Sequence, residues 1–199
     1  IFAIEKGMNK ILERMQNKDE MYKLFNKNVI CDIELLNEGY YLMLLNSVWD
    51  ATTLGMHTVY DKMVDWIIDT IRWILEHTNK TIVIRQHPAE RNKLAKGNDD
   101  YEKIIQNIFG NEVRIVLVAP EDDINTYALI KKSSTVVGFC STSVVESVAL
   151  GKPAIIVSST YYANLGIVYN ANSKEEYYSY LYKSSKNELE VTQEMKDRA

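Results

Sequence analysis

The sequence predicts an α/β domain in which a parallel sheet is covered by helices on both faces. Short apolar runs alternate with longer helical patterns five times along the 199 residues. These runs are apolar throughout, which is typical of strands that are buried on both sides. Because connections between parallel strands are right-handed, the expected arrangement is a doubly wound, Rossmann-like, three-layer domain.

The apolar runs and helical patterns place each element in order. Strands are expected at Tyr40–Leu45, Thr81–Arg85, Val113–Val118, Thr135–Phe139 and Ala154–Val157. Pro88 prevents the second strand from continuing, and Gly151 occupies a position suited to a left-handed helix cap. Helices are expected at Val59–His77, Glu90–Phe109 (interrupted near Gly97), Ile124–Lys132, Ser143–Leu150 and Glu175–Tyr182.

These elements divide the chain into three parts. Residues 1–38 begin with a charged helical pattern, and we expect them to connect to an N-terminal domain outside this sequence. Residues 39–185 form the Rossmann-like domain, and residues 186–199 form a C-terminal tail or a last helix. The cluster Tyr177, Tyr178, Tyr180 and Tyr182 is expected to pack its helix onto the domain.

Composition narrows the classes of function. A net charge of -4 and a pI near 5.5 argue against a general nucleic-acid binder. Two cysteines, Cys31 and Cys140, make no disulfide framework, so a cytoplasmic location is expected. No apolar run reaches the roughly 18 to 20 residues that span a bilayer. No zinc spacing, GxGxxG or Walker loop occurs, so neither a metal nor a dinucleotide cofactor is expected.

Ligands of such sheets bind beyond the carboxyl ends of the strands, so residues just after each strand were considered first. Arg85 ends the second strand and His87 follows it. Arg offers a forked, permanently charged donor for phosphate, and His can donate a hydrogen bond or transfer a proton. The alternative is a histidine that caps the following helix and an arginine in a surface ion pair.

The second candidate segment is Cys140–Glu146, directly after the fourth strand. Ser141, Thr142 and Ser143 offer three hydroxyls before a helix whose first N–H groups are expected to face the same crevice and attract phosphate. Ser143 and Glu146 also have the spacing of a capping box, which needs no ligand. Glu146 therefore either caps the helix or accepts the hydroxyls of a ribose.

Two further segments follow strands but have less specific chemistry. Asn125, Thr126 and Tyr127 could lie against a nucleotide base, although Tyr127 is equally compatible with the core. The loop after the first strand carries Asn46, Ser47, Trp49 and Asp50. His57 and His77 flank the long helix, and we expect neither to be a ligand.

Taken in order, these motifs resemble a known family. The order is His87-Pro88, then Asn125–Ile130, Ser141–Glu146, Leu150–Pro153 and Tyr161–Gly166. It is similar to the C-terminal half of the bacterial capsule polysaccharide biosynthesis family, which includes Kdo transferases. It is more distantly similar to sialyltransferases and to teichoic-acid glycerophosphotransferases.

The resemblance implies the C-terminal, donor-binding half of a GT-B glycosyltransferase. His87 would contact the donor phosphate as the candidate catalytic residue, Ser141, Thr142 and Ser143 would complete that site, and Glu146 would contact the ribose or donor. Tyr162 would lie in a loop lining the donor cleft. The acceptor, a polysaccharide or a lipid-linked chain, and the catalytic base would belong to the other domain. Peripheral association with the inner face of the membrane would come through partners.

Two other functions use the same residues. One is transfer of a polyol phosphate from a CDP-linked donor, which needs the same grip on phosphate. The other is a non-catalytic module that binds a nucleotide or sugar phosphate. For the glycosyltransferase no metal is expected, because no Asp-x-Asp sequence is present to chelate one beside a diphosphate.

Overall fold

A computed structural model describes residues 2–20, 39–47, 58–92, 97 and 99–199. Its centre is a six-stranded sheet with the strand order β3-β2-β1-β4-β5-β6, in which each neighbouring pair is parallel. Its strands are β1 (Tyr40–Leu44), β2 (Ile82–Arg85), β3 (Ile115–Val118), β4 (Ser133–Gly138), β5 (Ala154–Ile156) and β6 (Tyr169–Asn170). This order brings β1 beside β4, and the chain reverses its direction of winding between them.

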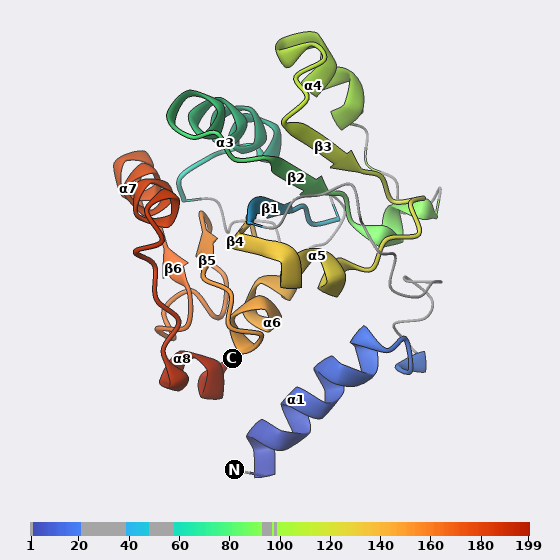
Figure 1. The fold of residues 1–199 in the computed structure, drawn as a ribbon, viewed down its shortest axis with the longest axis vertical. Coiled ribbons are helices and arrows are strands. Elements are labelled where there is room, and N and C mark those ends of the chain that lie inside the picture. Colours follow the sequence, from blue (N-terminus) through green and yellow to red (C-terminus); the bar gives the residue numbers. More distant parts are fainter. Residues whose placement is uncertain (1, 21–38, 48–57, 93–96, 98) are drawn as a thin grey trace.

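Helices cover both faces of the sheet, which confirms the predicted three layers (Figure 1). One face carries α3 (Met63–His77), α4 (Tyr101–Phe109) and α7 (Lys174–Ser185). The other face carries α1 (Phe2–Met15), α5 (Thr126–Lys132), α6 (Ser143–Ala149) and α8 (Gln193–Arg198). The predicted last helix of the tail is α8.

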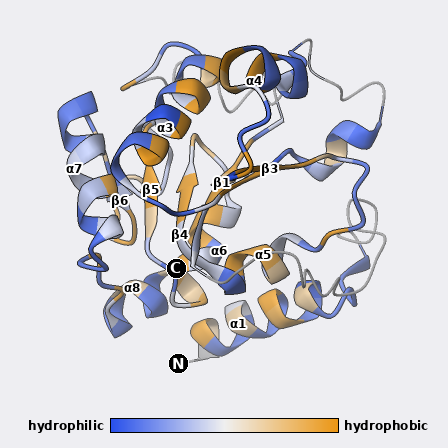
Figure 2. Ribbon diagram, turned by 45° about the horizontal axis from the view of Figure 1, so that its top comes forward, coloured by the Kyte–Doolittle hydropathy of each residue, from blue (hydrophilic) through white to orange (hydrophobic). Residues whose placement is uncertain are grey.

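Strand β1 shows why the sequence folds in this way. Tyr41 and Met43 belong to the core beneath α3, whereas Tyr40, Leu42 and Leu44 belong to the core on the opposite face. Burying one large apolar side chain stabilises the fold by about 1.5 to 3 kcal/mol, so a run apolar on both sides favours the centre of the sheet. Figure 2 shows apolar strands between helices that are apolar on one side and polar on the other.

Two predicted helices differ from the structure, and one strand was not predicted. The helix predicted over Glu90–Phe109, with an interruption near Gly97, corresponds at its start to a 3-10 helix, η2 (Pro88–Arg91), and residues 93–96 and 98 lie outside the described part of the chain. The α-helix begins later because the Asp100 side chain accepts a hydrogen bond from the N–H of Lys103 at 3.2 Å and caps it. Helix α3 begins at Met63 rather than Val59. Strand β6 was not predicted, because it is only two residues long.

Two glycines fix the ends of α6. Gly151 follows the helix with a φ of 80°, which confirms the left-handed cap. Gly138 ends β4 where the helix approaches most closely, and a Cβ atom placed there would lie 2.3 Å from Cγ2 of Val144. Helix α6 therefore packs directly on the strand, and the turn between them has little freedom to move.

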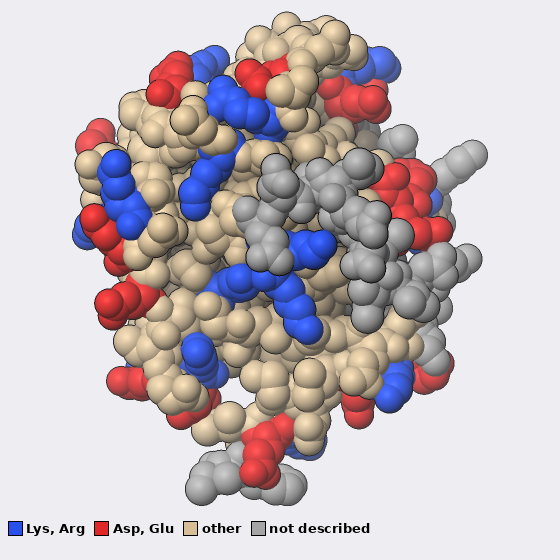
Figure 3. Space-filling view, viewed as in Figure 1, with Lys and Arg blue, Asp and Glu red and all other residues tan. Residues whose placement is uncertain are grey.

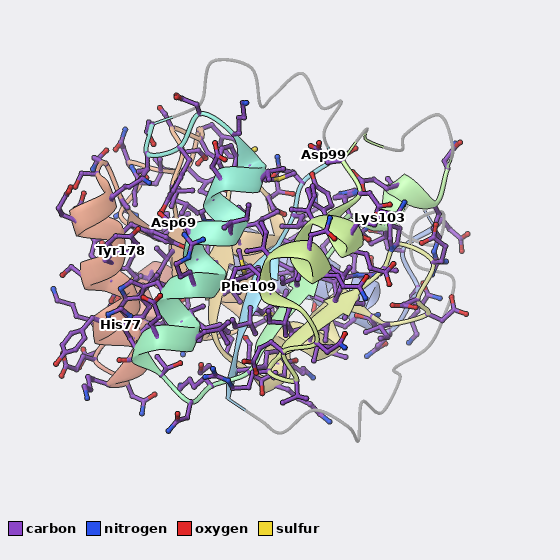
Figure 4. The ribbon with its side chains drawn as sticks, turned by 90° about the horizontal axis from the view of Figure 1, so that it is seen from above. Asp69, His77, Asp99, Lys103, Phe109 and Tyr178 are labelled. Atoms are coloured by element: carbon purple, nitrogen blue, oxygen red, sulfur yellow. The ribbon has the colours of Figure 1, made fainter. Side chains whose placement is uncertain are left out.

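The boundary between α3 and α7, which we call the α3–α7 seam, is built from aromatic and polar side chains (Figure 4). Tyr177 is fully buried, and the hydroxyl of Tyr178 donates to Oδ2 of Asp69 at 2.6 Å. The predicted packing role of the tyrosine cluster is confirmed for these two residues. It is wrong for Tyr182, which is 54% exposed. His77 stacks on Trp73 with ring centres 4.6 Å apart.

The surface shows charges of both signs. In Figure 3, basic side chains gather towards the middle of the visible face and acidic ones towards its rim. Among the described residues, no helix combines the length and apolar character needed to cross a bilayer. Helix α1 packs on the sheet through Ile11, which is 7% exposed within the same core as β1.

Candidate functional site

The candidate site lies where the carboxyl ends of β1 and β4 meet. Asn46 and Cys140 are 94 residues apart in sequence but are paired across this point. The Asn46 amide donates to Sγ of Cys140 at 2.9 Å, and its Oδ1 accepts from the backbone N–H of Cys140 at 3.3 Å. This pair holds the start of the segment that follows β4, at the position where sheets of this strand order bind ligands.

Two cavities open on either side of the Ser141–Ser143 turn. The first, which we call the Glu146 cavity, has a volume of about 240 Å³ and is lined by Arg14, Arg85, His87, Thr126, the turn and Glu146, with neighbouring residues of β1 and β2. The second, which we call the Thr160 cavity, measures about 170 Å³. His87 and all three residues of the turn line both cavities. The structure thus brings the main predicted site residues together.

His87 serves as a cap and also faces the cavities. Its Nδ1 accepts a hydrogen bond from the backbone N–H of Ala89 at 3.2 Å and so caps η2. A neutral imidazole with Nδ1 as acceptor carries its hydrogen on Nε2. The capping half of the alternative is therefore confirmed, whereas its other half, Arg85 in a surface ion pair, is wrong because Arg85 is 2% exposed. The cap does not exclude a ligand, because His87 lines both cavities.

The Ser141–Ser143 turn forms the wall shared by the cavities. Its carbonyl groups accept the first N–H groups of α6, from Val144 to Ser141 at 3.2 Å and from Val145 to Thr142 at 3.0 Å. The expectation that these N–H groups face the crevice is therefore wrong for those two residues. The hydroxyls of the turn, rather than a helix of seven residues, are the groups available for a ligand.

Glu146 does not form the capping box that its spacing suggests. One carboxylate oxygen accepts from the guanidinium of Arg14, and the other accepts from the hydroxyl of Tyr127 at 2.8 Å. Burial raises the pKa of Glu146, and the hydrogen bond from Tyr127 and the charge of Arg14 oppose that rise. Each carboxylate oxygen has two acceptor sites, so Glu146 can still accept a hydroxyl from a ligand in the cavity.

Arg85 holds the loop between β3 and α5. It is 2% exposed, and its two terminal nitrogens donate to the carbonyls of Ala119 and Ile124. Arg91 donates hydrogen bonds to the same loop, at the carbonyls of Pro120 and Asp122. Arg85 lines the Glu146 cavity, but the hydrogen bonds described here are structural.

The three residues at the start of α5 have different roles beside the Glu146 cavity. Asn125 caps the helix, its Oδ1 accepting from the N–H of Tyr127 at 2.8 Å. Thr126 lines the cavity, and its buried hydroxyl has no hydrogen-bond partner among the described residues. Tyr127 is 1% exposed and belongs to the core, from which its hydroxyl reaches Glu146.

The Thr160 cavity gathers the ends of β1, β4 and β5. Ser47, which follows β1, lines this cavity. Trp49, Asp50 and His57 lie outside the described residues. Tyr162 is 1% exposed, and its hydroxyl donates to the carbonyl of Ser141 at 2.7 Å. Tyr162 therefore holds the Ser141–Ser143 turn in place through this hydrogen bond. Sequence reasoning missed Arg14 and Thr160, which carry no local motif.

No metal site is apparent in the part of the chain that the structure describes. Within it, no group of three or more His, Cys, Asp or Glu side chains is placed to hold a metal ion. The site is instead made of hydroxyls, an imidazole, guanidinium groups and one carboxylate. Such a set binds phosphate and hydroxyl groups through hydrogen bonds.

Solved structures define the class of fold. The S. aureus MnaA structure with UDP matches with a TM-score of 0.54 at 18% identity, over 86% of this chain and 46% of that one. The Methanocaldococcus jannaschii UDP-GlcNAc 2-epimerase with UDP-GlcNAc and UDP has a TM-score of 0.54 at 16% identity, over 98% and 50%. The Thermosulfurimonas dismutans KpsC, a beta Kdo 2,4 transferase, has a TM-score of 0.55 at 12% identity, over 98% and 54%.

This chain therefore spans about half the length of the structures it matches. The predicted α/β domain, equivalent to one half of a GT-B protein, is confirmed at the level of the fold. Residues 10–194 match the family described as capsule polysaccharide biosynthesis protein, and the chain belongs to that family. None of the curated protein sequences matches the chain significantly.

Proposed function

We propose that this chain is the donor-binding half of a glycosyltransferase that builds a capsular or other surface polysaccharide. The observation that carries the proposal is the pair of cavities that share His87 and the Ser141–Ser143 turn at the junction of β1 and β4. A nucleotide sugar has a charged phosphate between two larger groups. It therefore fits a site in which a phosphate grip lies between two cavities.

The phosphate would lie against the shared wall. The Nε2–H of His87 and the hydroxyls of the turn are donors, and charge-assisted hydrogen bonds of this kind are about twice as strong as neutral ones. In glycosyl transfer the bond between the sugar and the phosphate oxygen breaks, and negative charge grows on the departing phosphate. Donors already fixed by the cap and by Tyr162 would stabilise that charge without reorganising.

The nucleoside would occupy the Glu146 cavity. Glu146 would accept ribose hydroxyls while Arg14 and Tyr127 hold its carboxylate in place. Asn125, Thr126 and the loop held by Arg85 would border the base. The similarity to structures that contain UDP or UDP-GlcNAc supports a nucleotide in this part of the fold.

The rest of the reaction would depend on a second domain. The acceptor hydroxyl must be positioned and deprotonated, and we assign that task to an N-terminal domain joined through residues 1–38. The acceptor would be a growing polysaccharide or a lipid-linked chain at the cytoplasmic face of the membrane. Transfer of a polyol phosphate from a CDP-linked donor would use the same phosphate-binding groups, and the same experiment tests it.

Calorimetric titration of the full-length protein with CMP, CDP, UMP, UDP and GDP tests the proposal. We expect one base to be preferred, and we expect His87→Ala to weaken that nucleotide about 10- to 100-fold, the loss of a hydrogen bond to a charged group. His87→Asn separates the two roles of the imidazole. Its Oδ1 can replace Nδ1 as the cap while the Nε2–H donor is lost, so binding should fall although stability is kept.

His77→Ala is the matched control. His77 lies against Trp73 at the α3–α7 seam and should leave nucleotide affinity unchanged when removed. Equal affinity of parent, His87→Ala and His87→Asn for every nucleotide would contradict the proposed donor site. Binding without any sugar or polyol transfer by the full-length protein would favour a non-catalytic module instead.

A further inference from the structure

Helix α1 is held on the domain by few buried side chains. Among its described residues, Ile11 alone is buried, at 7% exposure, while Met8 and Met15 pack more loosely against the same core. In Figures 1 and 2, α1 lies at the periphery of the molecule. An isolated helix of 14 residues is marginal in water, so α1 depends on these contacts to remain folded.

A groove of about 440 Å³, which we call the α1 groove, separates part of α1 from the domain. Ala3, Ile4 and Gly7 line it from the first half of α1, and Ala149 lines it from α6, together with residues of α8. Side chains that border such a gap make fewer dispersion contacts than closely packed ones. The attachment of α1 therefore depends mainly on its second half, which carries Ile11.

The second half of α1 also carries the polar contacts that reach the Glu146 cavity. The guanidinium of Arg14 donates to one carboxylate oxygen of Glu146 and, through Nε, to Oδ2 of Asp19 at 3.0 Å. Asp19 is 5% exposed and also accepts from Nζ of Lys10 at 3.1 Å. Arg14 is therefore held between a buried carboxylate just beyond its own helix and a carboxylate on α6.

The ion pair of Arg14 and Glu146 lies between two spaces. Both residues line the Glu146 cavity and the α1 groove, so the pair forms part of the partition between them. Removing one partner from a largely buried ion pair leaves the other charge uncompensated, which is strongly unfavourable. Displacement of α1 would therefore deprive Glu146 of its counter-charge and leave it the hydrogen bond from Tyr127.

We infer that α1 is a docking element that completes the nucleotide cavity, and that Arg14 is the positioning residue through which α1 docking and nucleotide binding strengthen each other. The inference rests on the proposed function, because it takes the nucleoside to lie against Glu146. A carboxylate that is already charged and oriented accepts ribose hydroxyls without reorganising, so the nucleotide binds the docked state more tightly. By linkage, the nucleotide stabilises the docked α1 by the same factor.

Calorimetry on the full-length protein tests the inference with the nucleotide that the parent prefers. We expect Arg14→Ala to weaken this nucleotide about 5-fold or more, the lower end of typical couplings between two sites. Ile11→Ala loosens α1 without removing the Arg14–Glu146 pair, and it should weaken the nucleotide as well. Lys6→Ala is the matched control, because Lys6 is an exposed cation on the same helix and its loss should leave the affinity unchanged. An unchanged affinity in Ile11→Ala would overturn the inference.

A double-mutant cycle shows whether Arg14 acts through Glu146. In a Glu146→Gln background, Arg14→Ala should remove little further affinity, because the carboxylate that Arg14 positions is already gone. Arg14→Lys keeps a positive charge and should retain part of the affinity that Arg14→Ala loses. Equal losses from Arg14→Ala in the two backgrounds would overturn the inference, because Arg14 would then act independently of Glu146.

Hydrogen exchange measures the reciprocal effect on α1. Saturating nucleotide should slow the exchange of the α1 amides several-fold in the parent and should leave it unchanged in Arg14→Ala. Unchanged exchange in the parent would overturn the inference. In each of these cases, a weakening of the nucleotide by His87→Asn would show that the donor site itself stands. Absence of nucleotide binding altogether would overturn both proposals.

Discussion

The α3–α7 seam and the carboxyl edge of the sheet differ in whether their buried polar groups have hydrogen-bond partners. At the seam the hydrogen bonds form a closed chain. Nε1 of Trp66 can only donate and gives its hydrogen to the Tyr177 hydroxyl at 3.1 Å. That hydroxyl lies 2.7 Å from Oγ1 of Thr70, which donates to the carbonyl of Trp66 at 2.7 Å. At the carboxyl edge, the hydroxyls of Ser47 and Thr126 are buried without such partners among the described residues.

The difference separates polar groups whose hydrogen bonds are completed within the fold from polar groups that lack a partner among the described residues. Asp69 at the seam accepts from Tyr60, Tyr178 and Lys174, at 2.8, 2.6 and 3.2 Å. Such a cluster of charged and aromatic groups could be mistaken for an active site, yet the contacts of Tyr178 and Lys174 join α7 to α3, and that of Tyr60 joins the segment before α3 to the same helix. A completed network needs no ligand, whereas an incomplete one beside a cavity indicates where a ligand supplies the missing bonds.

The largest expected effect breaks the closed chain at the seam. Tyr177→Phe leaves Nε1 of Trp66 without its acceptor in a fully buried position, so we expect the free energy of unfolding to fall by about 1 to 3 kcal/mol. Urea unfolding measures this loss. Tyr182→Phe, on the same helix but 54% exposed, should change stability by less than about 0.5 kcal/mol. Equal stability of the two variants would mean that the chain contributes nothing.

A smaller effect at the seam should depend on pH. Burial by itself raises the pKa of Asp69, but hydrogen bonds from Tyr178, Tyr60 and Lys174 outweigh it and hold that pKa below its usual value. A carboxyl whose pKa is lower in the folded state stabilises the fold above its unfolded pKa of about 3.9, and loses that contribution as the pH falls through the folded pKa.

We therefore expect Asp69→Asn to lower the free energy of unfolding by about 1 to 2 kcal/mol at pH 7. The difference from the parent should shrink steadily as the solution is acidified below pH 4. Chemical unfolding at a series of pH values measures it. A difference that stays constant down to pH 2 would show that the charge of Asp69 contributes little.

The smallest expected change in stability lies at the carboxyl edge. Thr126→Val replaces a buried, unpaired hydroxyl by a methyl group. We expect the free energy of unfolding to stay within about 0.5 kcal/mol of the parent or to rise, because no hydrogen bond is lost. Nucleotide affinity should nevertheless fall several-fold. A clear loss of stability with unchanged affinity would assign Thr126 to the fold instead.

The sequence predicted the sheet well because its signals are local. The central strands β1 and β2 are apolar runs bounded by breaking residues, and Pro88 marks where β2 must end. Strand β6 was not predicted, because two residues are too few to show the alternating pattern of a strand. The long helix before Gly110 was overestimated, since apolar spacing alone could not show that Asp100 starts a new helix.

The site was predicted in part for the same reason. The positions after β2 and β4 could be identified from strand ends, which pointed to His87 and the Ser141–Ser143 turn. The sequence left Glu146 between a capping box and a ligand contact, because the partner that separates the two, Arg14, is 132 residues distant. Pairings over such distances, like that of Asn46 with Cys140, depend on the tertiary fold.

The close contact at Gly138 limits how this site can change over evolution or by design. Any side chain at that position would press against Val144 and displace the helix, and with it the three hydroxyls just ahead of it. Ser47 and Thr160, which line the Thr160 cavity, can be exchanged without touching that contact. Substitutions elsewhere around the cavities therefore leave this contact intact, whereas position 138 accepts only the residue with no side chain.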